Sequence, residues 1–242
     1  MSGRSHLLAT LPLAPVLFLQ AHRVRRSIPR MPEPPGPRRG LSGTGPRLKV
    51  LIAGDSAAAG VGASHQDEAL AGQLVGSLSA DYSVEWSLEA RTGATTATTL
   101  RRLRELDEEN FDVAVTSLGV NDVTAGSSRR SWRSRQRELR DLLRGAFGVS
   151  GIVVCGLPPV HGFPALPQPL RWYLGERARA FDIDLEADAE AEEGVRFLSL
   201  RFSEDPSEMA SDGFHPGPAV YARWGRMAAL AISQLATERQ GD

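Results

Sequence analysis

The chain has 242 residues, of which 41% are hydrophobic and 24% are charged. This composition excludes a polytopic membrane protein, a collagen-like chain and full-length disorder, and the length is enough for one sizeable core. The net charge of −1 hides two unlike parts: the first 50 residues carry nine basic residues and one acidic residue, whereas the remainder carries 19 and 28. We therefore divide the chain into an N-terminal arm, residues 1–46, and a domain, residues 47–242.

The arm contains an apolar segment, residues 7–21, followed by arginines and then by a proline-rich stretch. As a helix the apolar segment would extend about 22 Å, short of a hydrocarbon core of about 30 Å. The arginines resist translocation, so we interpret the segment as a contact with the inner face of an anionic membrane and expect a cytoplasmic location. A disordered or surface-draped arm remains an equal alternative. The prolines predict an extended linker over residues 29–46.

From residue 48 onward, short apolar runs alternate with segments of helical periodicity. This alternation predicts an α/β fold in which a parallel sheet is sandwiched between helices. The expected strands are residues 48–53, 82–90, 112–118, 152–155 and 195–198, and the expected helices are residues 65–80, 95–106, 131–147, 171–193 and 218–236.

Polar turns rich in glycine follow three of the predicted strands, and another precedes the last helix. Because functional residues gather at the carboxyl ends of parallel strands, these turns are expected to converge on one rim of the sheet. The turns are residues 54–56, residues 91–93, residues 119–122 and residues 212–215.

These turns supply the groups that acyl transfer by a serine nucleophile requires. Ser56 can attack if His215 accepts its proton and Asp212 orients the imidazole. A tetrahedral oxyanion needs preorganised donors, which the Ser56 and Gly93 backbone N–H groups and the Asn121 side-chain amide can provide.

At these residues the chain resembles the SGNH/GDSL hydrolase family. The matching blocks are Gly54-Asp-Ser56, Gly93, Gly119-Val-Asn-Asp122 and Asp212-x-x-His215, in the family's order. The resemblance implies a three-layer, flavodoxin-like α/β/α sandwich with strand order 2-1-3-4-5. It also implies ester hydrolysis through an acyl-serine, without a metal or another cofactor. One departure is Ala57, where the family usually has leucine, which affects only the packing beneath the nucleophile.

The long loop after the fourth strand is the best candidate for substrate contact. Phe163, Leu166, Trp172 and Tyr173 are expected to wall an acyl pocket, unless they merely cover the core. The single cysteine, Cys155, lies in an apolar run and is expected to be a buried strand residue.

The leading function is therefore an esterase or thioesterase for small or medium acyl substrates, with carbohydrate O-acetyl esterase as the alternative. Two alternatives without catalysis are a nucleotide-binding module, for which the glycine-rich segment 54–62 lacks the phosphate-loop lysine, and a silent scaffold. No nucleic-acid partner is expected, because neither a binding module nor interleaved aromatic residues accompany the cations of the arm.

Overall fold

A computed structural model describes residues 12–27, 29, 31–107, 109–201 and 205–238. Within these residues, six strands form one sheet in the order β1-β3-β2-β4-β5-β6. Strands β2 to β6 are parallel to one another, whereas β1 lies antiparallel to β3 at the edge. The five parallel strands have the predicted order 2-1-3-4-5, so the α/β sandwich is confirmed.

The boundaries of the predicted elements lie within a few residues of those observed, except that the helix predicted from residue 65 begins at Leu70. The strand at residues 39–42 and the helices at residues 14–27 and 120–124 are additional to the predicted elements. The strands are β1 (Arg39–Ser42), β2 (Arg47–Gly54), β3 (Ser83–Ala90), β4 (Val113–Ser117), β5 (Gly151–Cys155) and β6 (Val195–Leu198). The helices are α2 (Ala14–Ser27), α3 (Leu70–Leu78), α4 (Thr96–Leu103), α5 (Val120–Thr124), α6 (Arg129–Phe147), α7 (Leu170–Glu190) and α8 (Pro218–Glu238). Short 3₁₀ helices are η1 (Gln66–Glu68), η2 (Val160–Gly162) and η3 (Pro206–Glu208).

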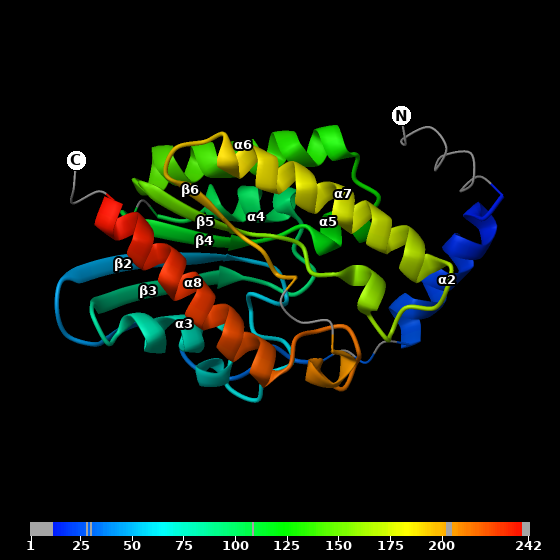
Figure 1. Ribbon diagram of the computed structural model, residues 1–242, viewed down its shortest axis with the longest axis horizontal. Helices are drawn as coiled ribbons and strands as arrows, with labels where there is room; N and C mark the ends of the chain where they lie inside the picture. The colour runs from blue at the N-terminus through cyan, green and yellow to red at the C-terminus, as the bar shows by residue number, and fades with distance from the viewer. Residues whose placement is uncertain (1–11, 28, 30, 108, 202–204, 239–242) are drawn as a thin grey trace.

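Different helices cover the two faces of the sheet (Figure 1). Helices α3 and α8 cover one face, and α4, α5, α6 and α7 cover the other. Successive side chains of β2 enter opposite core clusters: Val50 and Ile52 pack toward α3 and α8, and Leu51 and Ala53 toward the other layer. Strand β2 is thus apolar on both faces, as expected for a central parallel strand covered by helices.

Helix α6 begins two residues earlier than predicted because a serine caps it. The Ser128 side chain accepts a hydrogen bond from the Ser131 N–H, and Gly148 ends the helix with a φ of 60°. The Arg129 Nε donates to the Asp184 Oδ2 over 2.7 Å, which ties the first turn of α6 to α7.

The proline-rich stretch is not an extended linker separate from the domain, and this expectation is corrected. Residues 39–42 form β1, whose backbone pairs with residues 84–87 of β3. Glu33 accepts hydrogen bonds from the Thr92 N–H and hydroxyl, at 2.7 and 2.9 Å. The folded unit therefore begins before Arg47. Strand β1 belongs to it because its backbone forms hydrogen bonds with the N–H and C=O groups at the edge of β3.

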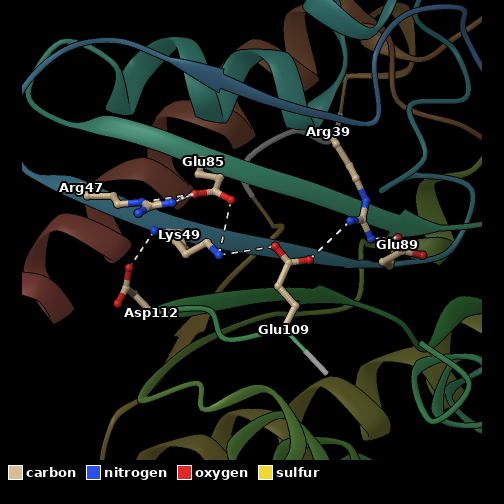
Figure 2. Close-up of polar contacts among 7 residues, drawn as sticks. All are labelled: Arg39, Arg47, Lys49, Glu85, Glu89, Glu109 and Asp112. Carbon is tan, nitrogen blue, oxygen red and sulfur yellow. Dashed lines mark hydrogen bonds and ion pairs between the residues drawn. The ribbon is translucent and has the colours of Figure 1, made fainter. Parts of the chain in front are cut away.

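A network of charged side chains lies beside β1, β3 and β2, on the face that carries Glu85 and Glu89 (Figure 2). Arg39 of β1 contacts Glu109 at 3.3 Å and Glu89 at 3.5 Å, and Lys49 lies 3.3 Å from Glu85. Glu89 is buried, whereas the Arg39 side chain is largely exposed, so this ion pair links the edge strand to the interior of the domain. Arg39 and Lys49, which contribute to the positive charge of the first 50 residues, thus form ion pairs with glutamates of the domain. The network comprises Arg39, Arg47, Lys49, Glu85, Glu89, Glu109 and Asp112.

Helix α2 occupies most of the described part of the apolar segment, and residues 7–11 of that segment lie outside the described residues. The helix packs against α7, with Leu17 buried in the core cluster of that layer. Among the described residues no helix has both the length and the apolar character needed to cross a bilayer. The cytoplasmic location stays a prediction.

Two truncations test whether β1 belongs to the domain. Removal of residues 1–30 retains Glu33 and β1, whereas removal of residues 1–46 deletes both. We expect the longer deletion to lower the melting temperature by about 5–10 °C relative to the shorter one, because several hydrogen bonds at about 1 kcal/mol each are lost. Calorimetry of both proteins provides the measurement, and equal melting temperatures would show that β1 adds no stability.

Candidate active site

The turn after β2 brings a serine to the carboxyl edge of the sheet. A side chain at Gly54 would place a Cβ 2.6 Å from the Ser117 carbonyl oxygen and 2.4 Å from the Ala58 Cβ, so glycine alone fits there. The Asp55 N–H donates to the same Ser117 carbonyl over 3.1 Å. Ser56 is therefore held at a fixed distance from the end of β4.

The loop before α8 presents a histidine and a carboxylate to that serine. The His215 Nδ1 lies 2.6 Å from the Asp212 Oδ2, and its Nε2 lies 2.9 Å from the Ser56 Oγ. Because a carboxylate only accepts hydrogen bonds, Nδ1 must carry the ring hydrogen, which leaves Nε2 to accept the hydroxyl hydrogen of Ser56. The three side chains expected to act together form one continuous hydrogen-bonded row.

Electrostatics keep the buried end of this row ionised. Burial raises the pKa of Asp212, but hydrogen bonds from the His215 N–H, the His215 ring and the Phe214 N–H more than offset it, so the pKa lies below its usual value. An ionised Asp212 fixes the tautomer of His215 and can stabilise an imidazolium that forms when the proton leaves Ser56.

The donors expected for an oxyanion come from three turns, those that carry Ser56, Gly93 and Asn121. Asn121, in the first turn of α5, donates from Nδ2 to the Ala94 carbonyl over 3.0 Å and lies 3.4 Å from the Asp55 Oδ2. Gly93 has a φ of 78°, and the space where a Cβ would stand is open. In the described part of the chain, neither the Ser56 N–H nor the Gly93 N–H has an acceptor.

Two further carboxylates support these turns. The buried Asp55 accepts a hydrogen bond from the Ala57 N–H over 3.1 Å, and burial raises its pKa to about 7. The buried Asp122 accepts from the Thr96 N–H and hydroxyl, at 2.9 and 3.0 Å, and burial raises its pKa as well. Both residues hold turns in place through these hydrogen bonds.

A cavity of about 100 Å³ opens beside Ser56 and His215. Its wall is largely apolar, and Phe214 packs between His215 and Phe163, with ring centroids 5.3 and 5.1 Å apart. This volume has room for several water molecules and so for a short apolar group. The apolar wall includes Leu118, Val120, Leu157, Phe163, Leu200, Met209, Phe214 and Trp224.

Residues 52–223 match the GDSL-like lipase/acylhydrolase family, which is more than half of the chain. The chain belongs to this family. The match begins in β2 and ends in α8, so it includes all the blocks on which the resemblance to SGNH/GDSL hydrolases is based. That resemblance is confirmed, and the protein is an esterase of the serine hydrolase type.

Solved structures share the fold of this GDSL-family protein at low sequence identity. The psychrotrophic esterase EstA from Pseudoalteromonas sp. is 16% identical over 78% of this chain and 99% of its own, with a TM-score of 0.60. The carbohydrate acetylesterase Est24 from Sinorhizobium meliloti is 17% identical over 78% and 99%, with a TM-score of 0.57. The acetylxylan esterase Axe2 from Geobacillus stearothermophilus is 18% identical over 78% and 93%, with a TM-score of 0.54. None of the curated protein sequences matches the chain.

Of the four residues expected to wall the pocket of this GDSL-family protein, the structure brings Phe163 to the cavity. Leu166 is buried in the core cluster, and Trp172 and Tyr173 are half-buried in the first turn of α7 and are not among the residues that line the cavity. Phe163 belongs to the same core cluster as Leu166 and also borders the cavity. Leu157, which also lines the cavity, lies in the loop expected to contact substrate. Sequence reasoning missed Met209 and Phe214, of which only Phe214 adjoins a predicted catalytic residue in sequence.

The two remaining expectations concern the cysteine and metal binding. Cys155 is buried, and desolvation raises the pKa of its thiol to about 12, so it is the inert strand residue expected. The Trp224 Nε1 donates to its sulfur over 3.3 Å. Within the described ranges, no group of three or more His, Cys, Asp or Glu side chains is arranged to hold a metal ion.

Replacement of the amide donor tests the oxyanion assignment. We expect Asn121→Ala to lower kcat by about 10²–10³-fold with little change in KM, because the lost hydrogen bond forms only in the transition state. Steady-state kinetics on a soluble ester provide the measurement, and circular dichroism checks the fold. A kcat within a few-fold of wild type would exclude Asn121 as a donor.

The raised pKa of Asp55 predicts that stability falls as pH rises from about 4 to about 7. In this range the unfolded chain has released a proton that folded Asp55 retains, so higher pH favours unfolding. We expect the free energy of unfolding of Asp55→Asn, measured by urea denaturation at about pH 5 and about pH 8, to change less with pH than that of wild type. An identical pH dependence of the unfolding free energy in both proteins would show that the pKa of Asp55 is not raised in the folded protein.

Proposed function

We propose that this protein cleaves carboxylic esters or thioesters of small or medium acyl chains through an acyl-serine intermediate. The observation that carries the proposal is the hydrogen-bonded row of Ser56, His215 and Asp212 at the wall of a small apolar cavity. The row supplies a nucleophile, a base and an orienting carboxylate, and the cavity provides a place for the acyl group.

In the proposed reaction, the Ser56 Oγ attacks the acyl carbon while its proton moves to the His215 Nε2. The Ser56 and Gly93 N–H groups and the Asn121 amide stabilise the oxyanion of the tetrahedral intermediate. His215 then protonates the leaving alcohol or thiol, and the acyl-serine forms. Water, deprotonated by His215, hydrolyses this ester and regenerates the enzyme.

The alternative substrate class is an acetylated carbohydrate. Two of the similar solved structures are of proteins described as a carbohydrate acetylesterase and an acetylxylan esterase. A cavity of about 100 Å³ accommodates an acetyl group as readily as a short fatty acyl group. The cavity therefore limits the size of the acyl group, whereas no such limit on the alcohol or thiol group follows from it. Membership of a hydrolase family argues against the nucleotide-binding and scaffold alternatives.

A nucleophile knockout with a substrate series tests the proposal. We expect Ser56→Ala to lose up to about 10⁶-fold in turnover of p-nitrophenyl acetate and to escape labelling by a fluorophosphonate probe. Wild-type kcat/KM should fall once the acyl chain outgrows the cavity. Retained turnover in Ser56→Ala would refute the proposed nucleophile. A strong preference for acetylated sugars over simple esters would favour the carbohydrate alternative.

A further inference from the structure

Helix α2 has an outward apolar surface that no other described element covers. Val16, Phe18 and Leu19 are 42%, 73% and 67% exposed, whereas Leu17 on the opposite side is buried in the core. Most large apolar side chains elsewhere in the described chain are at least partly covered, so three neighbours this exposed on one short helix mark a contact surface.

The second half of the same outward surface is cationic. Arg23 and Arg26 are exposed on this surface, whereas the Arg25 Nη2 reaches back to the domain and donates to the Thr124 carbonyl over 3.5 Å. Residues 12–27 contain no acidic residue. An apolar first half followed by a basic second half suits a helix that lies in the interface of a bilayer, where lipid tails and anionic phosphates are neighbours. A second copy of this helix is a poor occupant, because residues 12–27 contain no acidic residue that could pair with the arginines.

This helix is also attached to the loop that carries Phe163, one of the residues that line the cavity. The Gln20 Nε2 donates to the Gln168 carbonyl over 2.7 Å, and the Gln20 Oε1 accepts from the Leu170 N–H over 3.0 Å. Gln168 belongs to the loop that carries Phe163 to the cavity. Figure 1 shows α2 at one end of the molecule, beside the start of α7 and apart from the sheet.

We propose that α2 docks the protein on an anionic lipid surface, with Phe18 and Leu19 in the boundary of the acyl chains and the arginines at the phosphates. The loop fixed to Gln20 then lies close to the bilayer. If the proposed esterase activity holds, esters that partition into the membrane reach Ser56 from this side. The docking itself does not depend on that activity.

Vesicle sedimentation with the full-length protein tests the docking. We expect binding to phosphatidylcholine vesicles that contain phosphatidylglycerol, and much weaker binding to phosphatidylcholine alone. The double variant Phe18→Ser with Leu19→Ser should bind on the order of 100-fold more weakly, because two apolar side chains no longer enter the lipid. Arg23→Gln and Arg26→Gln should each reduce binding about fivefold.

Leu230→Ser on α8 is the matched control, because Leu230 is 61% exposed and distant in sequence from α2. It should bind vesicles like wild type, and all of these variants should retain turnover of a soluble ester. Absence of binding to anionic vesicles, or an equal loss in Leu230→Ser, would overturn the proposal. So would a dimer in sedimentation equilibrium that the α2 double variant dissociates. Ser56→Ala should still bind vesicles, so failure of the proposed chemistry and failure of docking are distinguishable.

Discussion

The contact between the turn after β2 and the end of β4 is the constraint on which the site depends. Parallel pairing places Gly54 opposite Ser117, and the missing side chain at Gly54 lets the next peptide approach the Ser117 carbonyl. A larger residue would push Ser56 away from the edge of the sheet at which α5, the helix that carries Asn121, begins. The geometry of the nucleophile is therefore set by backbone packing, before any catalytic side chain contributes.

The histidine reaches this turn from the other end of the chain, and its loop is held independently. The Ala210 N–H donates to the His215 carbonyl over 2.9 Å, and the Tyr221 hydroxyl of α8 donates to the Val61 carbonyl over 2.7 Å. The second bond joins α8 to the segment that follows Ser56. Burial of Asp212 costs solvation, and three hydrogen bonds offset that cost. The row of three side chains thus persists because each loop is anchored outside it.

The sequence predicted the parallel sheet and the hydrogen-bonded row because both leave local signals. Ser56 follows an apolar strand, and Asp212 and His215 lie three positions apart before a helix. Strand β1 leaves no such signal: it is four residues long, contains glycine, and is defined by the edge of β3. The cavity wall was predicted poorly for a related reason. Leu166 and Phe163 are both buried apolar loop residues of one core cluster, and only tertiary packing decides which of them also borders the cavity.

Trp224 lies between the cavity and the core, so its fluorescence can report on the cavity. Its indole lines the cavity while its nitrogen is bound to the Cys155 sulfur, so the ring is fixed on one side and borders the substrate space on the other. Trp86 and Trp132 are buried in the packed layers, and Trp172 lies on α7. Filling the cavity changes the polarity around one tryptophan far more than around these three. Occupancy of the site is thus expected to be readable in the intrinsic fluorescence spectrum without a label.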